Sequence, residues 1–559
     1  MTPLDYLVIV LFSLMIFAIG LSFSRNAGKD MKTFFAAGGA VPWWINSLSL
    51  FMGFVSASTF VVWGSIAYSS GWVAITIQWA MSVAGLIVGF FIAPKWHKTK
   101  SLTAAEYICN RLGVRTQNTY SYIYLFIMVF LKGVCLYAVA IILQVATGIS
   151  LYVWVGLLGL IVILYTTFGG LWAVVVTDVL QFIILLSAGL ILLPLSFEKI
   201  GGVSSFVNTI KAQQLTEFFN LSDHKYTISF LLGFLFYNVF YLGGQWSFIQ
   251  RYTSVSTPKE ARKIGVLFGL FYVISPVIWM LPPMIYRAIN PSLAGIESEQ
   301  AYMLMAKTAL PSGMLGLIII SLSFATNSSV QGFLNISAGV ITNDLFKTIY
   351  PLSSEKLLIR VAKGATFLMG LVVILMGMMV PLMGGATNVI LSVASISGGA
   401  MYFPVIWTLY SKKQNSYTVL ATTILSLTIC LSLKFILPLA GGTPLSRAAE
   451  MVTGVLVPVS ILAFFELVLA LKKNPTTEFD NYQNYLVFKA DNSDQASDNP
   501  NESAGENKFG KKMIGIGILT TGFIIGFLGL MASIGKIYVL GVAFLLLMVG
   551  AGIFSKALK

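Results

Sequence analysis

The chain has 559 residues, of which 57% are hydrophobic and only 10% are charged, and its mean hydropathy is +0.85. These values exclude a soluble globular protein and indicate that most of the chain lies in a lipid bilayer. A net charge of +14 could indicate nucleic-acid binding, but most of the 35 Lys and Arg residues fall in connections on one side of the predicted spans. The basic excess therefore reflects membrane topology, and we expect no nucleic-acid partner.

The sequence contains no pattern typical of a bound cofactor. The three cysteines, at positions 109, 135 and 430, are too far apart to suggest a disulfide framework. The two histidines, His97 and His224, have no spacing that indicates a zinc, haem or iron–sulfur site. No GxxxxGK[ST] motif follows a strand, so ATP-driven transport is not expected.

About fifteen segments are apolar and long enough to cross a bilayer. They lie near residues 3–23, 43–68, 72–94, 119–147, 151–168, 171–197, 226–248, 264–286, 312–342, 361–383, 388–410, 417–437, 450–471, 513–533 and 537–555. We predict that the first is a retained span, because Asp5 stands where a signal peptide has basic residues. With the N-terminus outside, the C-terminus is cytoplasmic and the positive-inside rule is obeyed.

Two of these segments contain residues that weaken a helix. They are SLFMGFVSAST (49–59) and NVFYLGGQW (238–246), which open two groups of five spans. Paired broken helices in corresponding positions are typical of a five-plus-five inverted-repeat transporter whose site lies at the membrane midplane. The alternative is that these small residues only allow close helix packing.

Three polar side chains interrupt otherwise apolar spans. Gln78 lies in ITIQWAMSVAG, so we expect its amide to bond to protein or ligand. Lys132 lies near the middle of a span, where a cation costs roughly 2.5–3.5 kcal/mol and needs a partner, a water-filled cavity or a route to the interface. Asp178 lies some way into another span, on an ion path or in a structural hydrogen bond.

The most informative polar stretch is ATNSSVQGFLNISAGVITNDLF, residues 325–346. Its hydroxyl and amide groups are poorly suited to lipid and are expected to face protein or water. Adjacent serines near a carbonyl oxygen also suit a small hard cation. The alternative is that Ser and Thr hydroxyls bond back to carbonyls of their own helix.

The one long polar insert, about residues 474–509, is rich in Asn, Ser, Asp and Gln. This composition predicts that most of it is disordered, although YLVF (485–488) could dock locally. We expect a plain linker rather than a regulatory element.

Four stretches of the chain resemble the sodium:solute symporter family, whose members include sodium–glucose, proline, iodide and sialic acid transporters. The stretches are GLWAVVVTDVLQ (170–181), GGQWSFIQRYTSVSTPKEARK (243–263), SSVQGFLNISAGVITNDLF (328–346), and TIQW (76–79) leading to APKWHKTKSLTAAEYI (93–108). Their order and spacing fit the family over roughly residues 5–440. The resemblance implies an all-α, ten-helix inverted-repeat core, preceded here by one helix and followed by four.

The resemblance also implies a sodium site. Ser328 and Ser329 would supply hydroxyls, Ala325 a carbonyl, and Met52 and Val55 carbonyls released by the break in the second span. Carbonyls three residues apart can converge on one ion only where helical hydrogen bonds are lost.

A second sodium site, found in some relatives, is less compatible with this sequence. It would combine Asp178 with hydroxyls one turn beyond the serine pair, where this chain has Gln331 and Gly332. We therefore predict one sodium ion per cycle, with Asp178 on a possible cytoplasmic ion exit path.

In this family the solute lies beside the broken helices. The matching positions are Ser56, Thr59, Gln78, Phe240, Tyr241 and Gln245, with Phe54 nearby. Lys132 joins this set, because some sugar-carrying relatives have a lysine in this region and sialic acid carriers have an arginine nearby. The glucose pattern is absent: there is no histidine at Thr59, no acid at Gln78 and no lysine at Tyr272. The resemblance implies a sugar acid, such as sialic acid, or another small polar organic solute.

The predicted division of the chain follows these assignments. It comprises a first helix and loop (1–42), two inverted repeats (43–197 and 198–411), two accessory helices (412–473), a polar cytoplasmic loop (474–512) and two C-terminal spans (513–559).

The sequence favours a sodium-coupled importer in the plasma membrane, which would be the bacterial inner membrane. Its expected partners are sodium, the solute and the bilayer, with no obligatory protein partner and no cofactor. The alternatives are a membrane sensor built on a transporter-like core, a sodium-coupled amino-acid or monocarboxylate carrier, and an ion channel. The insert is too short for a kinase domain, which opposes the sensor, and no nucleophile–base set suggests an enzyme.

Overall fold

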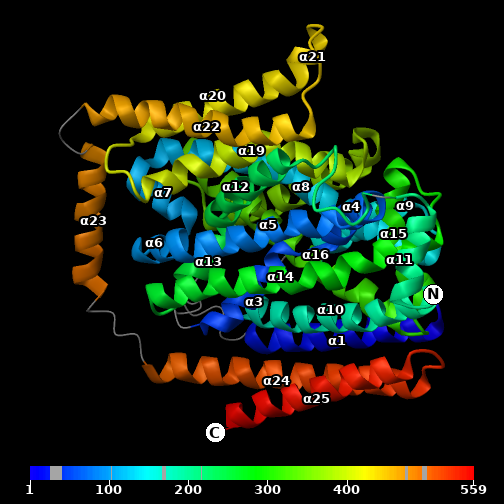
Figure 1. The fold of residues 1–559 in the computed structure, drawn as a ribbon. Helices are drawn as coiled ribbons and strands as arrows, with labels where there is room; N and C mark the ends of the chain where they lie inside the picture. The colour runs from blue at the N-terminus through cyan, green and yellow to red at the C-terminus, as the bar shows by residue number, and fades with distance from the viewer. Residues whose placement is uncertain are drawn as a thin grey trace.

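The computed structural model describes residues 1–24, 41–101, 103–165, 171–215, 217–471, 476–493 and 500–558, and their regular structure is helical (Figure 1). Within these ranges, 12 helices are long and apolar enough to cross a membrane, two further pairs of helices qualify as bent spans, and Leu151–Leu164 is a shorter apolar helix. Each of the segments predicted from the sequence falls on one of these helices, although residues 166–168 lie outside the described ranges. Figure 1 shows the N-terminus at the right side of the bundle and the C-terminus at its lower left.

The main helices are α1 (Pro3–Ser24), α3 (Trp43–Phe54), α4 (Gly64–Ser70), α5 (Val73–Ile87), α6 (Ala93–Lys98), α7 (Ala104–Leu112), α8 (Val114–Thr147), α9 (Leu151–Tyr165), α10 (Leu171–Ile200), α11 (Val203–Ala212), α12 (Ile228–Gly244), α13 (Trp246–Thr253), α14 (Pro258–Ile289), α15 (Ala301–Ala309), α16 (Met314–Gly339), α18 (Glu355–Met379), α19 (Gly385–Thr408), α20 (Ser416–Leu431), α22 (Arg447–Ala470), α23 (Thr477–Ser493), α24 (Pro500–Met531) and α25 (Lys536–Leu558). Shorter segments used below are η2 (Thr59–Trp63) and η4 (Gly295–Gln300).

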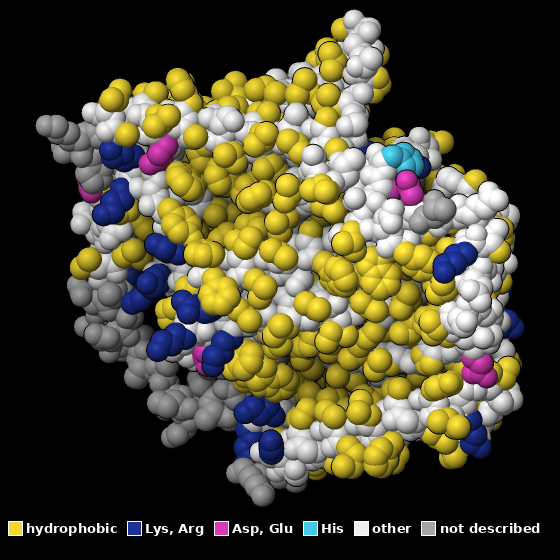
Figure 2. All heavy atoms as spheres, viewed as in Figure 1, with side chains coloured by type: hydrophobic (Ala, Val, Ile, Leu, Met, Phe, Trp, Pro, Cys, Tyr) yellow, Lys and Arg dark blue, Asp and Glu magenta, His cyan; other side chains and the backbone are white. Residues whose placement is uncertain are grey.

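Apolar and basic side chains occupy different parts of the surface of the bundle, as expected for a protein in a bilayer. Apolar side chains cover much of the face seen in Figure 2, while Lys and Arg side chains gather toward the end where Figure 1 shows α6, α13 and α23. A helix satisfies its own backbone hydrogen bonds, so it can present apolar side chains to lipid without cost. The charge distribution agrees with the predicted cytoplasmic end, and the orientation in the membrane stays a prediction.

The two predicted breaks are present. The axes of α3 and the η2–α4 segment differ by 62°, and those of α12 and α13 by 61°. At the second break, a Cβ on Gly244 would lie 2.6 Å from Cβ of Tyr402, so this close approach requires glycine. Both breaks are confirmed, while the relation of the two halves by an inverted repeat stays a prediction.

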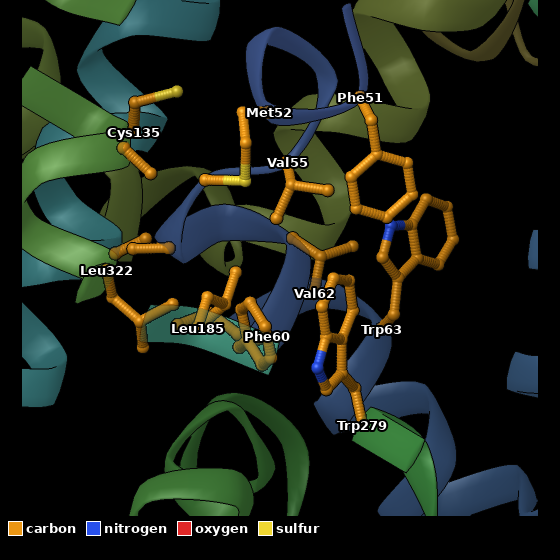
Figure 3. Packing of buried hydrophobic residues seen from close by; sticks show 14 of the residues in the cluster. Phe51, Met52, Val55, Phe60, Val62, Trp63, Cys135, Leu185, Trp279 and Leu322 are labelled. Atoms are coloured by element: carbon orange, nitrogen blue, oxygen red, sulfur yellow. The ribbon is translucent and has the colours of Figure 1, made fainter. Parts of the chain in front are cut away.

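The first break is held by aromatic packing on both sides. Phe51 of α3 and Phe60 of η2 both contact Trp279 of α14, with ring centroids 5.9 and 5.0 Å apart. Figure 3 shows these three rings, with Met52 and Val55 at the break itself. Because α14 holds the two helix segments at once, the bend is fixed by packing rather than left free.

The start of α16 is fixed by the first span. Asp5 is buried, and its Oδ1 accepts hydrogen bonds from the backbone N–H of Gly313 at 2.9 Å and of Gly316 at 3.1 Å. A carboxylate stabilises a helix N-terminus through its free N–H groups and dipole. Asp5 therefore positions the helix that carries the serine pair, a role that the sequence did not reveal.

The polar insert is more ordered than its composition predicts. Residues 477–493 form α23, which packs against α7, so the prediction of disorder is wrong for this part. The Arg111 guanidinium lies over the Phe479 ring at 5.2 Å, Tyr482 contacts Tyr107, and Lys489 pairs with Glu106 at 2.8 Å. The docking residues recur at helical spacing: they are Phe479, Tyr482, Tyr485 and Lys489. This periodicity predicts an amphipathic helix, which a prediction from composition alone misses.

The predicted docking of YLVF is seen at its first two residues. The Tyr485 hydroxyl donates to Glu106 and Leu486 is partly buried, whereas Val487 and Phe488 are largely exposed. Residues 494–499 lie outside the described part of the insert.

Candidate sodium and solute site

The break after α3 redirects two backbone amides. The Ser56 N–H donates to Thr59 Oγ1 at 3.2 Å, and the Thr59 N–H donates to the Ser56 carbonyl at 2.9 Å. In a continuous helix these amides would bond to the carbonyls of Met52 and Val55. Those two carbonyls thus lose their usual partners, which is the condition that the predicted sodium site requires.

The serine helix lies directly against this break. Thr326 Oγ1 of α16 accepts a hydrogen bond from the Ala57 N–H at 3.0 Å, which brings the following turn of α16 close to the released carbonyls. Ser329, on that turn, is partly exposed. The Ser328 side chain lies outside the described side chains. Since α16 is continuous through Ala325, a ligand from that carbonyl would use its second lone pair.

Lys132 of α8 contacts the predicted sodium site. Its Nζ donates to Ser329 Oγ at 2.6 Å, a short, charge-assisted hydrogen bond. Within the described ranges, no carboxylate lies at ion-pair distance from this ammonium group. The sequence placed Lys132 among the solute residues and did not link it to the serine pair.

One turn further along α8, Cys135 approaches the break from the same helix. Its Sγ lies 3.9 Å from Ser56 Oγ and 4.0 Å from Ser58 Oγ, and these two hydroxyls are 2.7 Å apart. Figure 3 shows Cys135 with Met52 and Val55. The helix α8 therefore contacts both the break and the serine helix, and no sequence pattern marked Cys135 for this position.

Gln78 is the predicted solute residue with an unused polar atom. Its side chain is fully buried, and its Nε2 donates to the Ala74 carbonyl of its own helix at 3.3 Å. Its Oε1 has no hydrogen-bond partner among the described residues. A buried acceptor without a donor is costly, so a ligand hydroxyl or N–H at this atom would stabilise the site.

The predicted solute residues of α12 are already engaged with protein. The ring of Phe240 packs on Phe403 at 4.7 Å, and Tyr241 contacts Phe54, Phe248 and Tyr402 at 5.6 Å each. These rings fill the space beside the second break.

Gln245 caps the helix that follows. Its Oε1 accepts from the Ser247 N–H at 2.6 Å and its Nε2 donates to the Tyr124 hydroxyl at 3.5 Å. Both polar atoms of its amide thus bond to protein groups, and a contact with solute stays a prediction.

Asp178 is held by both broken helices. Its Oδ2 accepts a hydrogen bond from Ser49 Oγ of α3 at 2.7 Å and lies 3.6 Å from a guanidinium nitrogen of Arg251 on α13. Both charged side chains are nearly buried, with 9% and 5% of their surface exposed. The structure thus provides Asp178 with a structural partner, which is the second of the two roles that the sequence left open; the predicted exit path stays a prediction.

A cavity of about 630 Å³ opens at the N-terminal end of the bundle, between α4, η4 and the starts of α19 and α22. Ser65 and Tyr68 line it, one to three turns beyond Thr59. At its floor Glu299 accepts hydrogen bonds from Tyr137 at 2.8 Å and from the Thr387 N–H at 3.1 Å, and burial raises the pKa of its carboxyl. The basic lining residues are His224, Lys225, Arg287 and Arg447. No sequence pattern indicated this vestibule, because its walls come from helices and loops far apart in the chain.

Comparison with known proteins agrees with this arrangement. The sequence profile of the sodium:solute symporter family matches residues 34–426. The sodium/sialic acid symporter SiaT of Proteus mirabilis (strain HI4320) is 27% identical over 434 residues, covering 75% of this chain and 86% of that protein. The sodium/glucose cotransporter of Vibrio parahaemolyticus is 27% identical over 469 residues, covering 77% and 85%.

The fold is also found among solved structures. A Na⁺-coupled sialic acid symporter in a substrate-bound, outward-open state superposes with a TM-score of 0.69 at 24% identity, covering 85% of this chain and 99% of that one. With its broken helices, its serine helix and a family profile that spans most of its length, the chain belongs to the sodium:solute symporter family.

Proposed function

We propose that this multi-pass membrane protein is a secondary active symporter that couples sodium entry to the import of a small polar organic solute. The observation that carries the proposal is the break at Val55–Ser58. There the Met52 and Val55 carbonyls are released, and Thr326 holds the serine helix against them. Support comes from relatives whose names specify sodium with sialic acid or with glucose. The predicted two-repeat division at 43–197 and 198–411 is part of this proposal.

We favour an anionic sugar acid as the solute class. Lys132 provides a cation at membrane depth, and three further cations, Lys225, Arg287 and Arg447, line the vestibule against one carboxyl group, that of Glu299. Gln78 offers an acceptor that a sugar hydroxyl or an amide N–H could satisfy. A path through the vestibule would attract anions before they reach the break.

The driving force is sufficient for such a carrier. One sodium ion crossing 100 mV releases about 2.3 kcal/mol. A tenfold sodium gradient adds about 1.4 kcal/mol. One sodium per cycle can therefore concentrate a neutral solute about several-hundred-fold, and a monoanion about tenfold, because its charge cancels the contribution of the voltage.

Uptake into proteoliposomes tests this function. The purified full chain would be given an inward sodium gradient, or a potassium gradient of equal size, and a panel of labelled sialic acid, glucose, myo-inositol, proline and lactate. We expect accumulation of one solute with sodium only, abolished by a sodium ionophore. Equal uptake with potassium, or flux that never exceeds equilibration, would contradict coupled symport and favour a channel.

Gln78 is expected to contribute to solute affinity and not to sodium affinity. Replacing it by Ala removes the buried Oε1 acceptor and should weaken solute binding by about 1–3 kcal/mol, if that atom bonds to solute. The measurement is the half-saturating solute concentration at saturating sodium. Gln213→Ala is a control, because Gln213 is a partly buried amide near the vestibule end, away from the break. Normal solute affinity with weakened sodium affinity would refute this role.

A further inference from the structure

Lys132 differs from two cations of the bundle that lie beside a carboxylate. Arg251 lies beside Asp178, and Lys434 pairs with Glu450 at 2.6 Å. The Lys132 ammonium instead donates to a neutral hydroxyl, that of Ser329, and no described carboxylate balances its charge. An ammonium has three donors, so two are left for another acceptor.

The contact with Ser329 has a consequence for sodium. Ser329 is one of the predicted sodium ligands, and its oxygen already faces a positive charge at 2.6 Å. A sodium ion on the same oxygen would lie close to the ammonium, and like charges repel strongly where water is scarce. The Ser329-bound ammonium therefore lowers the affinity for sodium in the solute-free protein.

The same helix carries a second polar group close to the Lys132 ammonium. Cys135 lies one turn from Lys132, on the same face, and contacts the hydroxyls of Ser56 and Ser58 at the break. The flexible four-carbon stem of lysine allows its charged end to move between neighbouring acceptors. A solute carboxylate bound near Ser56 would therefore lie close to the Lys132 ammonium.

We propose that Lys132 couples solute to sodium: its ammonium holds Ser329 in the empty protein, and an anionic solute neutralises or withdraws it so that sodium can bind. This proposal rests on the proposed sodium symport. By linkage, the solute must raise sodium affinity by the same factor by which sodium raises solute affinity. A neutral solute would not have this effect, so the device also selects for carboxylates.

The test is sodium binding by the purified full chain without any solute. Sodium chloride is titrated against a constant total salt of choline chloride, and the rise in unfolding temperature reports binding. We expect Lys132→Met to bind sodium about tenfold tighter than the unchanged protein, a coupling of the usual size. Lys132→Arg keeps the charge and should stay weak. Leu131→Met is the matched control, since it places the same side chain on the neighbouring position.

The outcomes separate this proposal from the proposed function. If the unchanged protein binds sodium and Lys132→Met binds it no tighter, the coupling role is overturned while sodium symport stands. If the unchanged protein shows no response to sodium without solute and Lys132→Met responds, the coupling role is supported, and the proteoliposome uptake experiment tests the proposed function separately. If neither responds, both proposals are overturned. Where sialic acid is bound, it should tighten sodium binding of the unchanged protein and leave that of Lys132→Met unaffected; equal tightening in both would overturn the coupling.

Discussion

Replacing Ser328 and Ser329 together by Ala is expected to abolish sodium-driven uptake while the protein stays folded. The change removes two of five predicted oxygen ligands, and a small cation needs several oxygens to replace its hydration shell. The measurements are solute uptake under a sodium gradient and the rise of the unfolding temperature with sodium.

A serine on the same helix provides the control. Ser337 is buried and its hydroxyl donates back to the Phe333 carbonyl at 2.8 Å, away from the break. Ser337→Ala should keep sodium-dependent uptake. Undiminished sodium dependence in the Ser328/Ser329 double variant would remove these residues from the sodium site. Ser328→Ala alone can retain weak activity if water fills the vacant position.

The second large effect is expected at the buried pair of Asp178 and Arg251. Replacing Arg251 by Met leaves the nearly buried Asp178 carboxylate with the Ser49 hydroxyl as its remaining partner among the described residues. Removing one member of a buried pair typically costs about 3–5 kcal/mol of folding free energy. We expect a marked fall in unfolding temperature, and a loosening of α3 and α13, which the pair joins to α10.

A double-variant cycle measures whether the charges are coupled. Asp178→Asn combined with Arg251→Met removes both charges and should recover part of the stability that Arg251→Met alone loses. As a control, Lys434→Met breaks a more accessible pair, whose side chains are 18% and 20% exposed, and its cost should be smaller than that of Arg251→Met. Strictly additive losses at Asp178 and Arg251 would show that the two groups act independently.

The sequence by itself determined the spans and the breaks, because both are local properties. Twenty or so apolar residues must cross a bilayer, and glycines with polar neighbours weaken a helix at the positions where they stand. The bends after Phe54 and Gly244 follow from this chemistry. The assignment of Ser328, Ser329, Met52 and Val55 to sodium came from resemblance and stays a prediction; the freed carbonyls of the first break are compatible with it at Met52 and Val55.

Tertiary structure alone decided which polar groups meet. Lys132 and Ser329 are 197 positions apart, and Asp178 and Ser49 are 129 positions apart. Whether such side chains touch depends on how each helix is rotated and how it crosses its neighbours, and hydropathy, which all spans share, does not encode that rotation. The same reason explains α23: composition predicted disorder, but α7 offers its aromatic face a partner, and burial of that face outweighs the polar character of the insert.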